Sequence, residues 1–248
     1  MAPAPSSRLT STDYTERRRA KWKYSVHWLT KDPWLNTPYV WRDSMTIPAL
    51  VEGRGITKRY GRTTVLNNVD ISISPGQIVG IVGENGSGKS TLLEILAGIL
   101  APTRGSVQRR ASIGYCPQGT LVFDALTVDE NLRYFGAGVG LCGSRLEARA
   151  SQLLTALALE RQRTRIVAQM SGGSKQKLNL IVALLDDPDL QLLDEPCSGL
   201  DWETYVSFWV LANRARDEGK SVVIVSHLIQ ERVNFDVVLT LRNGEVVT

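Results

Sequence analysis

The chain has 248 residues, of which 43% are hydrophobic and 22% are charged, and its formal net charge is +4. This composition is that of a folded protein with one large domain or two small ones, and it excludes collagen-like, disordered and disulfide-framework proteins. Residues 1–50 hold 8 Lys or Arg and 4 Asp or Glu, whereas residues 51–248 hold 21 of each. Because the excess positive charge lies in the first fifty residues, we do not expect sequence-specific binding of nucleic acid.

Cysteine content and apolar stretches restrict the class of protein further. Cys116, Cys142 and Cys197 are too few and too scattered for a disulfide scaffold or a zinc site, which indicates a reduced, intracellular chain. The apolar stretch at 91–102 is far shorter than the ~18 residues of a spanning helix, so we expect no part of the chain to cross a membrane by itself. The first 20 residues contain acids and no apolar core, which excludes a secretory signal and leaves a transit peptide as an alternative.

From Leu50 onward, short β-branched runs alternate with helical patterns, which is typical of βαβ units and a mainly parallel sheet. In chain order, the patterns predict an alternating strand at 65–73, a buried strand at 77–82, a helix at 89–99, a strand at 111–115, helices at 126–135 and 144–159, a helix that opens at Ser171 and continues through 178–185, a strand at 190–193, a helix rich in aromatic residues, and a strand at 222–226. The sequence contains no internal repeat and no low-complexity linker.

Residues 83–90 match the phosphate-loop pattern GxxxxGK[ST] between a predicted strand and a predicted helix. Glycines let backbone N–H groups surround an anion, the helix N-terminus adds about half a positive charge, and Lys89 reaches the terminal phosphates. Ser90 is expected to bind Mg²⁺. The alternative is a glycine-rich turn with a chance lysine, which the flanking strand and helix disfavour.

An apolar strand at 189–195 ends in two acids, Asp194 and Glu195. The first carboxylate can hold Mg²⁺ through water, and the second can polarise an attacking water. Taken alone, such a pattern is usually only the end of a strand, but together with the phosphate loop it predicts the second half of a nucleotide site. Gln191 stands inside this strand, where an apolar residue is expected, and the sequence offers no functional reason for it.

Three further motifs complete an ordered set. Ser171-Gly172-Gly173 precedes a helix, Ser198-Gly199-Leu200-Asp201 follows the acids, and His227 follows the strand at 222–226. With the phosphate loop and the acids, they resemble the ATP-binding cassette (ABC) ATPases over residues 50–248. The resemblance implies an α/β P-loop NTPase core with a mainly parallel sheet, an antiparallel β subdomain, and an inserted helical subdomain at about 119–180.

The family pattern also implies roles for individual residues. Tyr60 is expected to stack on adenine, and Gln118 to bind Mg²⁺ and water from a mobile loop. His227 is expected to contact the γ-phosphate and orient the water. Each has an alternative: Tyr60 as a turn aromatic, Gln118 as the cap of a strand, and His227 as a structural histidine.

The resemblance thus implies one complete set of site residues for ATP and Mg²⁺. The catalytic residues are Lys89, Gln118, Glu195 and His227. The metal ligands are Ser90, Gln118 and Asp194. The nucleotide contacts are Tyr60, Gly83, Glu84, Asn85, Gly86, Ser87, Gly88, Lys89, Ser90 and Thr91.

In the family, two cassettes pack head to tail, so that Ser171, Gly172, Gly173 and Asp201 of one subunit close over the nucleotide of the other. A serine and two glycines that open a helix form an anion site, which supports this assignment. Ser174 departs from the family pattern, in which glutamine is most usual, and Met170 stands where leucine is common. The shorter serine puts the contact across the dimer in question, and pairing with a different cassette is a hypothesis that would accommodate it.

The segment 123–141 falls where the family receives the coupling helices of a membrane partner. Its LTVDENL sequence looks like exporter-type cassettes, although Thr127 and Glu130 form a capping box that any helix could use. The resemblance therefore implies an ATP-hydrolysing subunit that dimerises with itself or another cassette. It would drive a separate transmembrane permease from the cytoplasmic face of a membrane.

Two rival functions stay open. One is a soluble cassette ATPase in translation, DNA maintenance or iron–sulfur assembly, although the second cassette or long coiled coils of such relatives are not present. The other is a nucleotide-binding regulator that does not hydrolyse ATP, which conflicts with the complete set of catalytic residues.

Residues 1–49 form a basic, tryptophan-rich extension outside the family pattern. Trp22, Trp28, Trp34 and Trp41 interleave with basic residues at spacings that do not make a helical stripe. Three interpretations remain: a segment that packs on its own domain or membrane partner, a membrane-surface anchor, and a platform for single-stranded nucleic acid.

Overall fold

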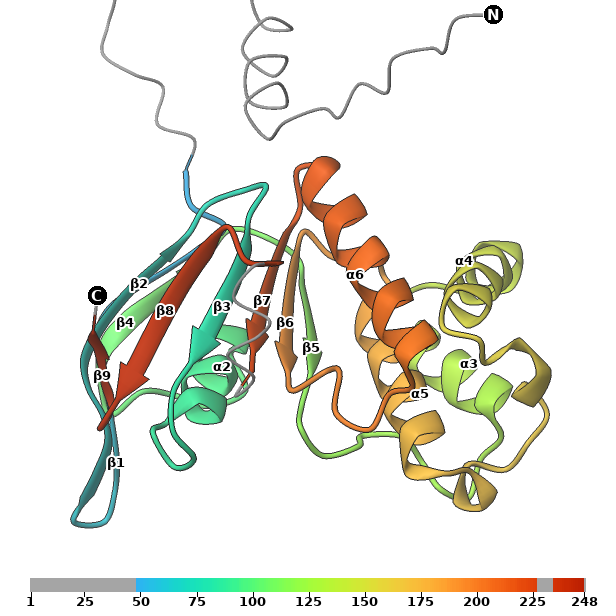
Figure 1. Ribbon diagram of the computed structural model, residues 1–248, viewed down its shortest axis with the longest axis horizontal. Helices are drawn as coiled ribbons and strands as arrows, with labels where there is room; N and C mark the ends of the chain where they lie inside the picture. The colour runs from blue at the N-terminus through green and yellow to red at the C-terminus, as the bar shows by residue number, and fades with distance from the viewer. Residues whose placement is uncertain (1–47, 227–233, 248) are drawn as a thin grey trace, which may run out of the picture. The chain divides into compact units, whose positions relative to one another are not determined.

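The computed structural model describes residues 48–226 and 234–247, which form two β-sheets with helices packed on them (Figure 1). Within these residues, the larger sheet has six strands in the order β5-β6-β7-β3-β8-β9. In chain order they span Ile78–Val82 (β3), Ile113–Cys116 (β5), Leu190–Asp194 (β6), Ser221–Val225 (β7), Val237–Arg242 (β8) and Glu245–Val247 (β9). All neighbours pair in parallel except β9, which runs antiparallel to β8. The mainly parallel sheet expected from the sequence is confirmed.

The three central strands of this sheet, β3, β6 and β7, are buried at every residue because the sheet is covered on both faces. Ile78, Val222 and Ile224 belong to one hydrophobic core, whereas their chain neighbours Val79 and Val223 belong to the other. This division follows from the two-residue period of a strand. It explains why each of these strands appears in the sequence as a nearly continuous apolar run.

The smaller sheet is antiparallel, in the order β2-β1-β4. Its strands span Val51–Tyr60 (β1), Thr63–Ile73 (β2) and Arg104–Arg109 (β4). Helix α2 (Lys89–Ala97) contacts β2 and β4 on one side and β5 and β6 on the other, so it lies between the two sheets (Figure 1). Its side chains Leu92, Leu93, Ile95 and Leu96 are almost completely buried there.

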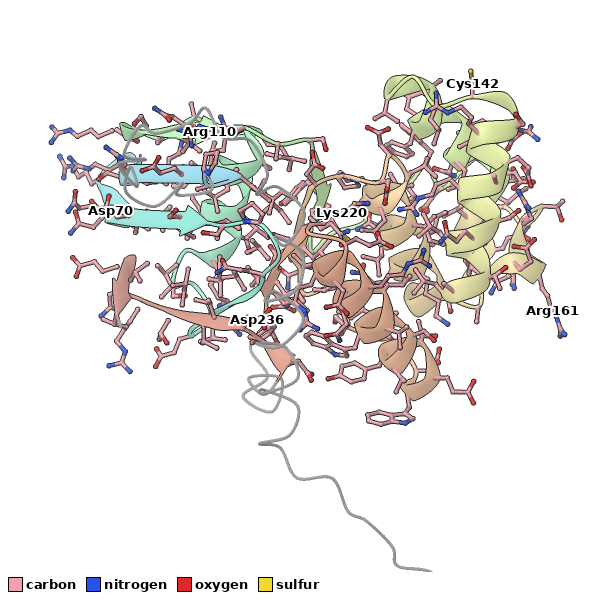
Figure 2. The ribbon with its side chains drawn as sticks, turned by 90° about the horizontal axis from the view of Figure 1, so that it is seen from above. Asp70, Arg110, Cys142, Arg161, Lys220 and Asp236 are labelled. Atoms are coloured by element: carbon pink, nitrogen blue, oxygen red, sulfur yellow. The ribbon has the colours of Figure 1, made fainter. Side chains whose placement is uncertain are left out.

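Helices α3 (Val128–Gly138), α4 (Gly143–Ala156) and α5 (Gly172–Leu184) lie between β5 and β6 in the chain, with short 3₁₀ turns at Glu160–Gln162 and Val167–Gln169. Helix α6 (Trp202–Asp217) follows β6. Helices α5 and α6 cover the face of the large sheet opposite α2. Figure 2 shows α3 and α4 at the far side of this helical group, with Cys142 of their connection directed outward. No helix in the described part of the chain has the length and apolarity that crossing a membrane requires.

Helix boundaries follow local chemistry. Helix α3 begins after Thr127 because Thr127 and Glu130 form the reciprocal capping box that their spacing predicts. Helix α4 ends at Ala156, three residues before the predicted end at 159, and Ala158 adopts a left-handed φ of 53°. Such a conformation cannot continue an α-helix.

Candidate nucleotide site

The phosphate loop lies between β3 and α2, as the sequence predicts. Gly88 has φ of 102°, and a Cβ there would come within 2.9 Å of the Val65 carbonyl oxygen, so only glycine fits. The Lys89 ammonium is buried and donates hydrogen bonds to the carbonyl oxygens of Gly83 (2.9 Å) and Glu84 (2.8 Å). The loop is thus already curled around its lysine at the N-terminus of α2, where the helix dipole favours an anion.

Asp194 ends β6 beside this loop and is 1% exposed. Burial raises the pKa of its carboxyl above the ordinary value, a hydrogen bond with Ser90 lowers it, and the nearby Glu195 raises it again. The Oδ1 atom of Asp194 is buried without a hydrogen-bond partner. A buried carboxylate oxygen with no partner next to a serine hydroxyl is a donor set that fits Mg²⁺, which prefers a few carboxylate and hydroxyl oxygens beside phosphates.

Glu195 follows Asp194 in a left-handed backbone conformation, with φ of 49°. Its N–H donates to the Val225 carbonyl oxygen (3.0 Å), and its own carbonyl accepts from Ser198 N–H (3.1 Å). Non-glycine residues in this conformation store about 1 to 3 kcal/mol of strain and cluster at functional sites. The two backbone bonds hold the strained residue at the carboxyl edge of the sheet.

A pocket of about 500 Å³ opens over the phosphate loop. Its lining comes from the loop and α2, from β2, and from the segments that follow β5 and β6: Val65, Asn85, Gly86, Gly88, Lys89, Ser90, Thr91, Gln118 and Glu195. Loops at the carboxyl ends of parallel strands meet at one edge of the sheet, which is where α/β folds bind ligands. The structure therefore gathers most of the residues expected to bind nucleotide around one cavity.

Several predicted residues lie elsewhere. Tyr60 ends β1, is 50% exposed, and carries the Lys58 ammonium 5.2 Å from its ring centre, but it does not line the pocket. Its stacking on adenine stays a prediction. Ser87 is buried, with an Oγ that has no hydrogen-bond partner, and like Gly83 and Glu84 it belongs to the loop without lining the pocket. His227 falls outside the described residues.

Val65 was not foreseen as a site residue. It lies on β2, partly buried, and lines the pocket beside the loop. An apolar residue on an alternating strand gives no functional signal in the sequence.

The polar residue inside β6, Gln191, faces polar surroundings. It is 6% exposed and lines a separate polar cavity of about 320 Å³ with groups that include Arg149, Asp187 and Lys220.

The residues expected to act across a dimer form a second cluster away from the pocket. Ser171 caps α5 by accepting from the Ser174 N–H (3.3 Å), and its hydroxyl donates to Ser174 Oγ (3.1 Å). A Cβ on Gly173 would come within 2.6 Å of the Gly199 carbonyl oxygen, so the start of α5 packs tightly on the segment before α6. Ser174 thus has local partners, but whether it weakens a contact between subunits stays a hypothesis.

Asp201 caps α6 by accepting from the Thr204 N–H (2.9 Å), and it also accepts from the Lys177 ammonium (2.8 Å). Lys177 chiefly, and Thr204 next, hold the pKa of this carboxyl far below its usual range. Asp201 therefore stays ionised at all physiological pH values, at the surface that Gly173 and Ser171 share. Its contact with a second subunit stays a prediction.

The fold and the pocket together define a nucleotide-binding P-loop domain. Residues 66–198 match the family model described as "ABC transporter", and the chain belongs to this family. It is 34% identical over 197 residues to "Nod factor export ATP-binding protein I" of Cupriavidus pinatubonensis (strain JMP 134 / LMG 1197), covering 75% of this chain and 61% of that protein. It is 30% identical over 210 residues to "Probable multidrug ABC transporter ATP-binding protein YbhF" of Escherichia coli (strain K12), covering 80% of this chain and 36% of that protein.

Solved structures agree with the family. The "Dimeric Structure of MJ0796, a Bacterial ABC Transporter Cassette" has a TM-score of 0.74 and 29% identity, with 80% of this chain and 97% of that chain covered. The same cassette in "a post-hydrolysis state … bound to ADP and Pi" has a TM-score of 0.73 and 30% identity, with the same coverage. These likenesses confirm the expected α/β cassette fold.

Proposed function

We propose that this chain binds and hydrolyses ATP as the nucleotide-binding subunit of an ABC transporter that works in export. One observation carries the proposal: the phosphate loop, Gln118 and Glu195 line one pocket, and the buried Asp194 is hydrogen-bonded to Ser90 of that lining. The names of two relatives, which refer to Nod factor export and to multidrug transport, support export as the direction of transport. The chain spans 61% of the first of these relatives, so its substrate and partners belong to the proposal.

In this mechanism, the phosphate loop holds the β- and γ-phosphates through backbone N–H groups. Lys89 exchanges its two carbonyl partners for phosphate oxygens and neutralises charge that develops in the transition state. Ser90, Asp194 and Gln118 would hold Mg²⁺, which when bound would neutralise part of the phosphate charge. Glu195 accepts a hydrogen bond from the attacking water and aligns it with the γ-phosphorus. His227 also contacts the γ-phosphate and helps to orient the water.

The partners in this proposal are a second cassette and a transmembrane permease. The second cassette meets the surface that carries Ser171, Gly173 and Asp201. The permease meets the aromatic cluster of Phe123, Tyr134 and Phe135, whose rings lie 4.7 to 5.7 Å apart. Phe123 and Tyr134 are 42% and 58% exposed, as a docking surface requires. The subunit then acts at the cytoplasmic face of a membrane.

Hydrolysis is tested with Glu195→Gln, and Glu203→Gln on exposed α6 surface serves as a matched control. We expect the unmodified chain and the control to turn over MgATP. Glu195→Gln should still bind ATP, lose turnover, and accumulate as an ATP-bound dimer in size-exclusion chromatography. Unchanged turnover in Glu195→Gln would refute the assignment, and no turnover in the unmodified chain would favour a non-hydrolysing regulator.

The transporter partner is tested by purifying tagged Glu195→Gln chain from detergent-solubilised native membranes with MgATP. A stoichiometric multi-span protein in the mass spectrum supports the proposal. Recovery from the soluble fraction with ribosomal, DNA or iron–sulfur proteins would instead support a soluble machine. We further propose that residues 1–49 are accessory to residues 50–248, so that deletion of 1–45 leaves ATP binding intact; loss of folding would contradict this.

A further inference from the structure

The side-chain amide of Asn179 is buried beside the segment that carries Gln118. Asn179 is 2% exposed on α5, and its Nδ2 donates to the Pro117 carbonyl oxygen (3.2 Å) and reaches that of Gly119 (3.5 Å). Its Oδ1 accepts from the Leu121 N–H (3.0 Å). The two carbonyls belong to the residues directly before and after Gln118. One side chain therefore fixes the backbone on both sides of Gln118.

The groups around the side chain of Asn179 require an amide. Nδ2 also lies 3.3 Å from the Sγ of Cys116, whose pKa is raised to about 12 by burial and by the charge of Asp194. Only a side chain that both donates and accepts can satisfy the carbonyls and the N–H together. Leucine has nearly the same shape but neither function, and aspartate keeps the acceptor while it turns the donor into a second acceptor that faces carbonyls.

Asn179 also connects the helix that begins at the Ser171 cap with the segment that carries Gln118. It lies on the helix whose first turn is capped by Ser171, about 12 Å along the axis from that cap at 1.5 Å per residue. Between them, α5 is a continuous helix with buried side chains at Leu178 and Leu180. The hydrogen bonds of this amide thereby join α5 to the residues on either side of Gln118, in addition to the ion pair between Lys175 and Asp124 (2.7 Å) nearer the start of the helix.

We propose that Asn179 is a positioning residue that couples the placement of α5 to the placement of Gln118 at the nucleotide pocket. A shift of α5 when its first turn meets a second cassette is passed to Gln118 through the hydrogen bonds of this amide. The inference rests on the proposed role of Gln118 as a ligand of Mg²⁺ and water. It assigns to Asn179 no contact with nucleotide.

The test is a double-mutant cycle of Asn179→Leu with Gln118→Ala in the full chain. A small displacement of a positioned group costs up to about 100-fold in rate, so we expect Asn179→Leu to lower kcat by about 10- to 100-fold. In the Gln118→Ala background, the same change should cost less than about twofold, because interacting residues are not additive. Equal losses in both backgrounds, or no loss in the first, would overturn the proposal.

A matched control comes from Asn131, a buried asparagine of α3. Its Oδ1 accepts from the Phe123 N–H (2.8 Å), and its Nδ2 donates to the carbonyl oxygens of Phe123 (3.1 Å) and Thr127 (2.9 Å), away from Gln118. Asn131→Leu should destabilise the chain without non-additivity toward Gln118→Ala. If Asn131→Leu shows the same non-additivity, the effect of Asn179 is general loosening and the proposal fails.

A second readout does not need hydrolysis. The ratio of ATP affinities measured with Mg²⁺ and with EDTA should fall in Asn179→Leu as it falls in Gln118→Ala, and should fall no further in the double variant. Absence of turnover in the unmodified chain would refute the proposed function, whereas an unchanged affinity ratio would refute this inference. If Asn179→Leu does not fold, Asn179→Asp decides: it should lower the ratio while it preserves hydrogen-exchange protection of the Leu121 amide, and an unaltered ratio overturns the inference.

Discussion

The substitution Asp194→Asn is expected to stabilise the nucleotide-free chain while it removes Mg²⁺-dependent ATP binding. The carboxylate of Asp194 is 1% exposed, and its Oδ1 has no partner. A buried, unsatisfied polar group costs about 1 to 3 kcal/mol, and more when it is charged. The amide of asparagine keeps a polar atom at this position but removes the charge, so we expect it to relieve on the order of 1 kcal/mol. For a domain of this size, 1 kcal/mol corresponds to about 2 to 4 °C in Tm.

The sign with pH follows from the raised pKa of Asp194. The folded chain holds this proton more tightly than the unfolded chain does, so the ionised group destabilises the fold above its folded pKa. This penalty disappears as pH falls toward the ordinary value of the carboxyl. The difference in Tm between Asp194→Asn and the unmodified chain should therefore be largest at neutral pH and shrink in acid.

The assay is thermal unfolding of both chains with EDTA and with saturating MgATP. Without nucleotide, Asp194→Asn should melt higher. With MgATP, the unmodified chain should gain Tm by ligand linkage, and the variant should gain far less. A lower Tm for the nucleotide-free variant would show that Lys89 and Ser90 already compensate the carboxylate, and the reasoning from its unpaired oxygen would then be refuted.

Three further predictions concern the loop, the helical group and a thiol. Lys89→Ala should weaken ATP binding at least tenfold in equilibrium titration, because two carbonyls and the phosphates lose their cation; unchanged affinity would refute the site. Arg163 pairs with three carboxylates at 2.7 to 3.3 Å, so Arg163→Leu should cost about 1 to 3 kcal/mol in urea unfolding, and a neutral effect would show that these pairs are solvent-screened. At pH 8, iodoacetamide should label exposed Cys142 but not Cys116, whose pKa is raised to about 12; labelling of native Cys116 would contradict its burial.

The strands that can be predicted from the sequence are those that are buried on both faces. Strands β3, β6 and β7 are recognisable because the sheet is covered on both faces, which makes most of their residues apolar. Strand β1 was not predicted, because Gly53 and Gly55 interrupt its pattern and its pairing with β2 contains register shifts. Strand β4 has a single partly buried side chain, Val107, between exposed polar residues, so its period is invisible in the sequence.

The residues of the candidate site also fall into two groups: those in contiguous motifs, and those that only tertiary packing brings to the site. The phosphate loop and the acids at the end of β6 are contiguous motifs, so the sequence marks both, and the acids gain their meaning from the presence of the loop. Val65 and Asn179 act through tertiary packing with segments far away in the chain, and no local pattern marks them. The contacts of Tyr60 also depend on how strands are placed in space, and its position outside the pocket lining could not be foreseen.

The resting arrangement of Lys89 bears on selectivity among cellular anions. Its ammonium is already satisfied by two carbonyl oxygens of its own loop. A single orthophosphate must displace them and returns little in exchange, whereas a triphosphate also engages the N-terminus of the helix and the opposite wall of the pocket. We therefore expect these hydrogen bonds of Lys89 to favour binding of a triphosphate over binding of inorganic phosphate.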